Sequence, residues 1–410
     1  MPLPLSHITV LDLSRILAGP WCAQLLADLG ATVIKIEHPE RGDDTRGWGP
    51  PFLEDTAGNE THEAAYYLGV NRNKQSVAVD FTQPEGQAIL LALARDADVF
   101  LENYKVGGLK KYGLDYPAVR GINPRIVYCS VTGFGQSGPY ASIAGYDFMI
   151  QGMGGLMSIT GERDDLPGGG PQKVGVAVSD IMTGLYATIG VQAALMHREH
   201  SGVGQHVDMA LLDTQVAMIA NLNMNYLISG KVPGRMGNAH ANIVPYQAFA
   251  SADGYVIIAV GNDSQFEKFC QIAGRTDLAQ DPRYRKNADR VRNRDALVPV
   301  IIDLMKTRPT KEWTTACDAA GVPCGPINNL DQVFSDPQVV HRGMRIDLPH
   351  PLSGTVPQVR NPIMFSETPL EYHHAPPLLG QHTASVLAER LGYDAAKIAD
   401  LAARKVIRVG

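Results

Sequence analysis

The first forty residues alternate between short apolar runs and one amphipathic stretch. Residues Ile8–Leu13 (ITVLDL) and Ala31–Glu37 (ATVIKIE) are short runs with several β-branched residues. Between them, Pro20–Leu29 has apolar residues at helical spacing and is followed by Gly30, a residue type that commonly ends helices. Strand, helix and strand in this order predict a parallel βαβ unit.

The same alternation returns after a long polar connection. Residues 41–63 are rich in Gly, Pro and Asp, and a connection of this length is more often functional than passive. Strands are then predicted at Ser76–Phe81, Val99–Glu102 and Arg125–Ser130, with a helix over Gln83–Arg95. Repeated βα units indicate a doubly wound, Rossmann-like α/β domain, in which ligands bind beyond the carboxyl ends of the strands.

The pattern changes near Tyr226. Loops rich in Gly, Pro and Asn precede an alternating strand at Tyr255–Val260, and charged helices follow. We therefore predict a smaller α+β domain over 226–325. The large domain is predicted to consist of 1–225 and a C-terminal return, 326–410.

Composition narrows the class of protein. The chain has 410 residues, with 36 Lys and Arg against 42 Asp and Glu, and a formal net charge of −6. Because proteins that wrap nucleic acid need a basic face, we expect no nucleic-acid partner. Single cores stop growing at about 250–300 residues, so this length predicts more than one packed unit.

The cysteines and apolar runs indicate a cellular compartment. The five cysteines form no C-x-x-C pair and no Cys/His spacing that suits zinc, so we expect neither a structural disulfide nor a metal site. The N-terminus lacks the pattern of a secretory signal. The apolar run Val174–Met196 includes Asp180, which would be costly in an isolated membrane span. We therefore expect a cytoplasmic protein with no membrane partner.

The first predicted turn between strand and helix, Ser14–Pro20, is a candidate ligand contact. It contains only Gly19 where a dinucleotide site needs G-x-G-x-x-G, so a nicotinamide or flavin enzyme is disfavoured. Arg15 lies where this fold places ligand contacts, although a surface arginine explains it equally well. Basic residues recur at neighbouring strand ends and would suit a phosphorylated or carboxylated ligand, unless they are ordinary solvated charges: Arg41, Arg46, Arg72, Lys74, Lys105, Lys110 and Lys111.

Asp180 is the most unusual ionisable residue, because it lies between two apolar runs. One interpretation is structural: Asp is a favoured N-cap, and a helix could begin at Ile181. The other is chemical: a carboxylate at a helix start inside a cleft can act as a base or a nucleophile. The two interpretations are compatible.

Segments in order along nearly the whole chain match one known family. They are VLDLSRILAGPWCAQLLADLGATVIKIEHPERGDDTR (10–46), NRNKQSVAVDF (71–81), DVFLENYKVGGLKKYGL (98–114), YCSVTGFGQSGPYASIAGYD (128–147), VAVSDIMTGLYA (176–187), GNAHANIVPYQAF (237–249), GVPCGPINN (321–329) and PPLLGQHT (376–383). These segments resemble the class III CoA-transferases, the family of formyl-CoA and carnitine CoA-transferases.

The resemblance implies a covalent mechanism in which Asp180 is the nucleophile. Its carboxylate would pass through an acyl-aspartyl anhydride and an aspartyl-CoA thioester, with water excluded to protect both. Coenzyme A thioesters would be substrates, and no permanently bound cofactor is implied. The resemblance also implies an interlocked homodimer.

The resemblance further implies the binding residues. The positions that match the family's CoA contacts are Arg15, Ile16, Leu17, Ala18, His38, Val79, Asn103, Tyr104, Lys111 and Tyr112. Position 38 is commonly arginine in the family, and here Arg41 lies close to it in the sequence. For the acyl group and its distal carboxylate, the expected contacts are Arg46, Arg72, Tyr146, Asp147 and His240.

The substrates implied are succinyl-CoA as donor and a C4–C6 dicarboxylic acid as acceptor, such as hydroxymethylglutarate, glutarate, itaconate, malate or citramalate. Racemases of α-methylacyl-CoA share the fold and use a His and an Asp, but the His position is Tyr146 here. Tyrosine, with a pKa near 10, is a poor base at neutral pH, so transfer is favoured over racemisation. A non-catalytic acyl-CoA-binding protein is the other alternative.

Overall fold

The computed structural model describes residues 1–410, and the chain forms two compact units. The sequence-based division placed 226–325 in the small domain, whereas the second compact unit also includes 157–173 and extends to Val339. We call the two units the large unit, made of Met1–Leu156, Val174–Leu227 and Val340–Gly410, and the small unit, made of Met157–Lys173 and Ile228–Val339.

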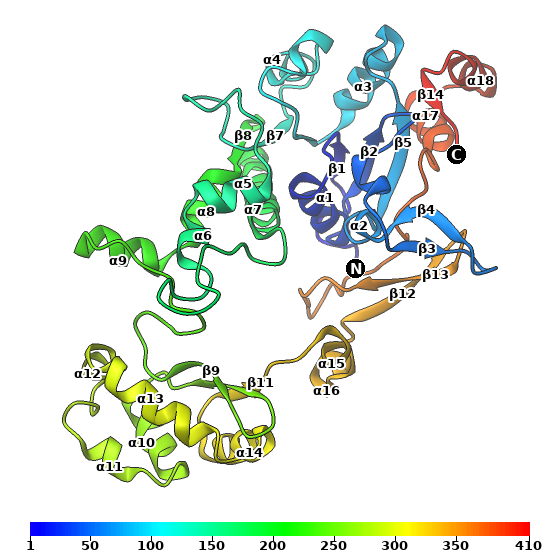
Figure 1. The fold of residues 1–410 in the computed structure, drawn as a ribbon. Coiled ribbons are helices and arrows are strands. Elements are labelled where there is room, and N and C mark those ends of the chain that lie inside the picture. Colours follow the sequence, from blue (N-terminus) through cyan, green and yellow to red (C-terminus); the bar gives the residue numbers. More distant parts are fainter. The chain divides into compact units, whose positions relative to one another are not determined.

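A seven-stranded sheet organises the large unit (Figure 1). Its order is β14-β5-β2-β1-β6-β7-β8, and every neighbouring pair is parallel except β14 with β5. From β1 the chain adds strands first on one side and then, from β6, on the other, so β1 and β6 flank the switch point at which such sheets bind ligands. The α/β class with a large parallel sheet is thus confirmed. The strands are β1 (Thr9–Asp12), β2 (Thr32–Glu37), β5 (Lys74–Val79), β6 (Val99–Glu102), β7 (Val127–Thr132), β8 (His206–Ala210) and β14 (Ile407–Arg408).

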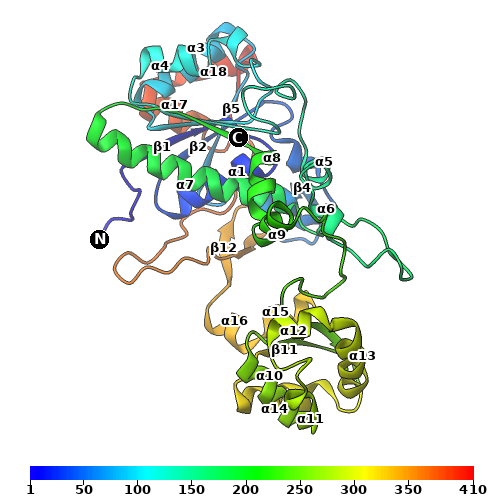
Figure 2. The same cartoon turned by 90° about the vertical axis from the view of Figure 1, so that its left-hand side faces the viewer.

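Apolar side chains on the two faces of this sheet form two separate cores. Leu11 and Ile34 belong to one core, while their strand neighbours Val10 and Val33 belong to the other, because successive side chains of a strand point to opposite faces. Figure 2 shows helices on both sides of the strands. The first core is completed by α3 (Pro84–Asp96), α4 (Tyr116–Ile122), α17 (Thr383–Leu391) and α18 (Ala395–Ala403), and the second by α1 (Ala18–Asp28) and α7 (Val178–Ser201).

Helix α7 packs closely against α1, and a glycine makes this approach possible. A Cβ atom on Gly184 would lie 2.7 Å from the carbonyl oxygen of Ala18, which is closer than such atoms approach each other. The start of α7 is thereby held next to the start of α1 and the turn before it. No helix in the chain, α7 included, is long and apolar enough to cross a membrane.

Shorter elements complete the large unit. The polar connection predicted at 41–63 contains a 3₁₀ helix, Asp44–Gly47, and the hairpin β3–β4. The remaining elements are β3 (Phe52–Glu54), β4 (Glu60–Ala64), α2 (Ala65–Leu68), a 3₁₀ helix (Lys110–Tyr112), α5 (Asp147–Met153), α8 (Leu211–Met218), β12 (Arg345–His350) and β13 (Gly354–Val359). Three further helices span the boundaries between the units: α6 (Leu156–Ile159), α9 (Asn221–Ser229) and α16 (Pro337–His341).

The small unit combines an antiparallel sheet, ordered β11-β10-β9, with helices around a core that includes the fully buried Trp313. Its strands are β9 (Tyr246–Ala250), β10 (Tyr255–Ala259) and β11 (Cys324–Pro326). Its helices are α10 (Asp263–Ile272), α11 (Thr276–Gln280), α12 (Asn287–Arg292), α13 (Arg294–Met305), α14 (Thr310–Ala320) and α15 (Leu330–Ser335).

Candidate active site

Asp180 lies in the first turn of α7. The helix begins at Val178 with Ala177 as its N-cap, so the expectation that Asp180 caps a helix starting at Ile181 is wrong. The capping carboxylate comes from elsewhere: Oδ1 of Asp147 accepts hydrogen bonds from the backbone N–H groups of Ser179, at 2.8 Å, and Asp180, at 3.4 Å. Because Asp147 serves these amides, the carboxylate of Asp180 is not needed for capping and lines a pocket instead.

The pKa of the Asp180 carboxyl group is raised towards neutral pH. Partial burial raises the pKa of its carboxyl group to about 7, and repulsion from the nearby Asp147 carboxylate adds to this effect. A carboxylate with a raised pKa is a better nucleophile than an ordinary surface carboxylate and is still substantially ionised at neutral pH. Asp180 is therefore chemically suited to covalent catalysis.

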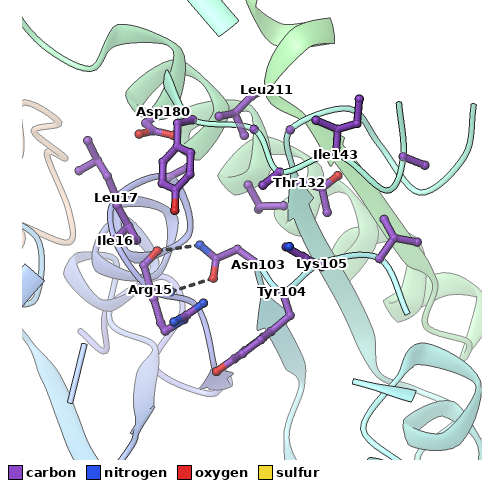
Figure 3. A pocket seen from close by; sticks show the side chains of 18 of the residues that line it. Arg15, Ile16, Leu17, Asn103, Tyr104, Lys105, Thr132, Ile143, Asp180 and Leu211 are labelled. Atoms are coloured by element: carbon purple, nitrogen blue, oxygen red, sulfur yellow. Dashed lines mark hydrogen bonds between the residues drawn. The ribbon is translucent and has the colours of Figure 1, made fainter. Parts of the chain in front are cut away.

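The pocket beside Asp180, which we call the first pocket, lies at the carboxyl ends of three neighbouring strands. Its wall includes the turn after β1, the segment after β6 and the end of β7, and its volume is about 220 Å³. Figure 3 shows Asp180 and the labelled residues of these strand ends around the pocket. The lining residues are Arg15, Ile16, Leu17, Ala18, Asp44, Asn103, Tyr104, Lys105, Val106, Val131, Thr132, Gly133, Ala141, Ile143, Ala144, Gly145, Tyr146, Asp180 and Leu211.

A second pocket, with a volume of about 400 Å³, continues from the first. The two share Arg15, Tyr104 and Lys105, so together they can hold an elongated ligand. Every residue that the family resemblance implies as a CoA contact lines at least one of the two pockets. Ile16, Leu17, Ala18 and Asn103 line the first, whereas the second is lined by His38, Arg41, Val79, Lys111 and Tyr112, among others.

Side chains hold the backbone between the two pockets. The Asn103 amide accepts a hydrogen bond from the N–H of Arg15 at 2.9 Å and donates one to its carbonyl oxygen at 2.7 Å (Figure 3). The Arg15 guanidinium pairs with Asp44 at 3.0 Å and lies 4.9 Å from the centre of the Tyr104 ring. Ile16 has a φ of 73°, a left-handed conformation that is strained for a β-branched residue. Such strain commonly occurs at functional sites.

Basic side chains line the second pocket, together with the acidic residues Glu37, Asp43 and Asp80. His38, Arg41 and Lys111 all line it, and Lys105 lies where it meets the first pocket. Guanidinium and ammonium groups bind phosphate through charge-assisted hydrogen bonds. Position 38, commonly arginine in the family, is a histidine here. Arg41 lines the same pocket and provides a guanidinium group there.

Arg46 and Arg72 do not line either pocket, although both were expected to contact the acyl group. Arg46 is buried and pairs with Glu37 at 2.8 Å and Glu63 at 3.0 Å. Arg72 is buried and forms an ion pair with Asp28. It precedes β5 and therefore lies at the amino ends of the strands, opposite the edge that carries the first pocket.

The other expected acyl contacts have different positions. Tyr146 lines the first pocket, and Asp147 caps the helix of Asp180. His240 belongs to the small unit, where its ring lies 5.1 Å from that of Tyr246. Sequence reasoning did not single out Thr132 or Leu211, which also line the first pocket. The rule that parallel strands end at one edge could have identified Thr132, the last residue of β7.

Comparison with known proteins agrees with this geometry. The model of CoA-transferase family III matches residues 5–383. A succinate–glutarate CoA-transferase from Agrobacterium fabrum is 53% identical over 386 residues, which cover 94% of this chain and 95% of the relative. A human succinyl-CoA:glutarate CoA-transferase is 42% identical over 404 residues, which cover 98% of this chain and 90% of the relative.

Solved structures show the same similarity. A CAIB/BAIF family protein from Brucella suis superposes with a TM-score of 0.83 at 50% identity, covering 95% of this chain and 100% of that chain. Rv3272 from Mycobacterium tuberculosis gives a TM-score of 0.81 at 30% identity, with 93% and 99% covered. The match of the family model over nearly the whole chain, together with these relatives, shows that this protein belongs to CoA-transferase family III.

Proposed function

We propose that this chain transfers CoA from succinyl-CoA to a C4–C6 dicarboxylate, with glutarate as the leading acceptor. One observation carries the chemistry: Asp180, whose pKa is raised to about 7, lines the pocket formed by the three strand ends. The acyl groups are supported by two relatives, 53% and 42% identical, whose names specify succinate or succinyl-CoA and glutarate.

The proposed reaction splits the exchange into covalent steps. An oxygen of the Asp180 carboxylate attacks the thioester carbonyl of succinyl-CoA; the C–S bond breaks, and CoA leaves as a thiolate. The thiolate then attacks the aspartyl carbonyl of the anhydride, which releases succinate and leaves an Asp180–CoA thioester. The acceptor carboxylate attacks this thioester and releases the thiolate, which takes the acceptor's acyl group from the new anhydride. Asp180 ends as a free carboxylate, and the energy of the thioester is conserved.

CoA is proposed to occupy both pockets. Phosphates would lie in the second pocket near Arg41 and Lys111, with His38 beside them. The pantetheine arm would pass Arg15 and Tyr104, which both pockets share, and present its thioester to Asp180. Tyr146 is proposed to contact the acyl group, because it lines the first pocket together with Asp180.

Mass spectrometry of thioesters tests this function directly. The purified protein is mixed with succinyl-CoA and an equimolar set of C4–C6 dicarboxylic acids, including glutarate. We expect glutaryl-CoA to appear as succinyl-CoA is consumed, with one succinate released for each thioester formed. A mixture without the protein is the control. Succinyl-CoA that stays intact with every acid would contradict the proposed donor.

We also propose that the protein is a homodimer, interlocked as the family resemblance implies. Leu185, Ile189 and Met196 recur on one face of α7 and are 38%, 63% and 68% exposed. Large apolar side chains grouped on one helix face are typical of association surfaces. A cytoplasmic location belongs to the same proposal, because the five cysteines are free thiols, which a reducing compartment favours.

Light scattering during size-exclusion chromatography tests the dimer. We expect a mass of twice the chain at micromolar concentration. We expect Ile189→Lys, which places a charge on the apolar face of α7, to increase the monomer fraction, whereas Met1→Lys, at an exposed terminus, should not. A monomeric wild-type protein would show that this apolar face does not mediate self-association.

A further inference from the structure

Two lysine–aspartate pairs lie beneath the turn that joins β1 to α1, and the proposed reaction uses neither. Lys35 pairs with Asp43 at 2.8 Å and Lys74 pairs with Asp12 at 3.3 Å, and all four side chains are 0% exposed. Lys35, in β2, pairs with a residue of the connection that follows β2, whereas the Lys74–Asp12 pair forms only when β5 and β1 join the same sheet. Buried charges in this arrangement need a physical explanation.

The first pair binds the backbone on both sides of Arg15. The ammonium group of Lys35 donates a hydrogen bond to the carbonyl oxygen of Ser14 at 3.0 Å. Oδ1 of Asp43 accepts a hydrogen bond from the N–H of Ile16 at 3.2 Å, while Oδ2 of the same carboxylate accepts from Lys35. One ion pair therefore holds residues 14 and 16, and Asn103 holds the residue between them.

The second pair binds the two ends of the same turn. Oδ1 of Asp12 accepts a hydrogen bond from the N–H of Ser14 at 2.9 Å. The ammonium group of Lys74 donates to the carbonyl oxygen of Pro20 at 3.0 Å, and also to the Asn71 side chain at 2.9 Å. Thus every member of the two pairs contacts the backbone of residues 14–20.

These contacts compensate an unfavourable conformation. Ile16 has a φ of 73°, and a β-branched residue keeps a left-handed conformation only where its surroundings impose it. Its N–H group is bound by Asp43, and the preceding residue is held at both its N–H and its carbonyl by Asn103. The turn that faces both pockets is therefore shaped by side chains below it.

Stability alone does not explain why charged groups occupy this site. Desolvation of a buried ion pair often cancels its attraction, and apolar side chains of similar volume are frequently at least as stabilising. Apolar side chains, however, cannot bind the Ser14 carbonyl or the Ile16 N–H. The pair Lys35–Asp43 is also charged at neutral pH, because Lys35 lowers the pKa of Asp43 to about 2 against the effect of burial.

We infer that Lys35 and Asp43 are positioning residues for coenzyme A, which hold Arg15 and Ile16 in the conformation that receives the ligand. This inference rests on the proposed role of the turn in CoA binding. Asp43 belongs to the wall of the second pocket, but the side chains of Lys35 and Asp43 are both 0% exposed, so each acts through the backbone it holds. The consequence is that their loss should weaken CoA binding more than it weakens the chemical step.

The test replaces the pair by an apolar one in the full-length protein, Lys35→Met with Asp43→Leu. We expect this double variant to fold, with CoA binding about tenfold weaker by calorimetry. The KM for succinyl-CoA should rise by a similar factor, while kcat stays within about twofold. Hydrogen exchange of the Ile16 amide should become at least tenfold faster, which measures the held turn without any ligand or activity.

The control is an ion pair at the amino end of the sheet, Arg198–Asp98 at 2.8 Å, in which Arg198 is buried and the Asp98 side chain is 24% exposed. It makes none of the contacts with the turn described above. Arg198→Met with Asp98→Leu should change the melting temperature but leave the affinity for CoA and the exchange of Ile16 unchanged. If the control weakens CoA binding equally, the effect is general destabilisation and the inference is wrong.

Each outcome has a distinct meaning. A folded Lys35→Met/Asp43→Leu variant that binds CoA as tightly as wild type, with Ile16 still protected, overturns the inference. If that variant does not fold, Asp43→Asn replaces it, and an unchanged KM with unchanged exchange at Ile16 then overturns the inference. Wild-type protein that binds no CoA contradicts the proposed function instead, while Ile16 exchange still reports whether the pair holds the turn.

Discussion

Replacing Asp180 by Asn is expected to lower kcat for CoA transfer by about ten-thousand-fold, while the affinity for CoA changes by no more than about threefold. The amide has nearly the shape of the carboxylate but lacks a nucleophilic oxygen, so neither the anhydride nor the enzyme thioester can form. Binding is preserved because the contacts proposed for CoA come from the turn after β1 and the strand ends. Steady-state kinetics and calorimetry on the same preparation measure the two effects separately.

Asp213 provides a matched control for this substitution. It is the third residue of α8, as Asp180 is the third residue of α7, but it is exposed and does not line the first pocket. Asp213→Asn should leave kcat within about twofold. A second readout is covalent: wild-type protein incubated with succinyl-CoA should yield a hydroxylamine-sensitive adduct on the peptide containing Asp180. Normal turnover by Asp180→Asn would refute Asp180 as the nucleophile.

Activity should fall steeply below neutral pH, with kcat/KM for succinyl-CoA decreasing about tenfold per pH unit below a midpoint near 7. Burial and repulsion from Asp147 raise the pKa of Asp180 to about 7, so acidification protonates the nucleophile well before an ordinary aspartate would be affected. At pH 5 the expected loss is about a hundredfold. Initial rates between pH 5 and 9, in buffers of constant ionic strength, measure this profile.

The substitution Asp147→Asn tests how much the charge of Asp147 contributes to the raised pKa of Asp180. The asparagine oxygen can still accept hydrogen bonds from the N–H groups of Ser179 and Asp180, but its negative charge is gone. The acidic limb of the profile should therefore move to lower pH, though not to the value of a surface aspartate, because burial is the larger cause of the raised pKa. A midpoint that stays in place would show that the Asp147 charge does not act on Asp180. If the acidic limb of the wild-type profile had its midpoint near pH 4, the carboxylate of Asp180 would be well solvated and its pKa not raised.

Local sequence patterns were sufficient for the elements that form the site. Strand β6 has the predicted bounds, and β1, β2 and α3 differ from prediction by only a few residues at their ends. The reason is that periodicity and terminating residues are read within a window of about ten to twenty positions. The rule that parallel strands present their carboxyl ends at one edge identified Arg15 as a candidate ligand contact, whereas Asn103 followed only from the family resemblance. Motif resemblance added Asp180 as nucleophile, and the structure places it in the same pocket.

The roles of the charged residues depended on contacts between distant parts of the chain. Arg46 and Arg72 resembled ligand contacts in the sequence, but each forms a buried ion pair once the fold brings Glu63 or Asp28 beside it. Asp180 resembled an N-cap until the fold supplied the carboxylate of Asp147 for that task.

By itself, then, the sequence determined the α/β class, the order of the elements, the family and the candidate nucleophile, because periodicity, strand-end positions and motifs are local properties. Only the tertiary structure decided which charges are paired, such as Lys74 with Asp12, and which line the pockets, such as Lys105. The physical reason is that a charge is solvated, paired or poised for chemistry according to its neighbours in space, and these come from segments far apart in the chain.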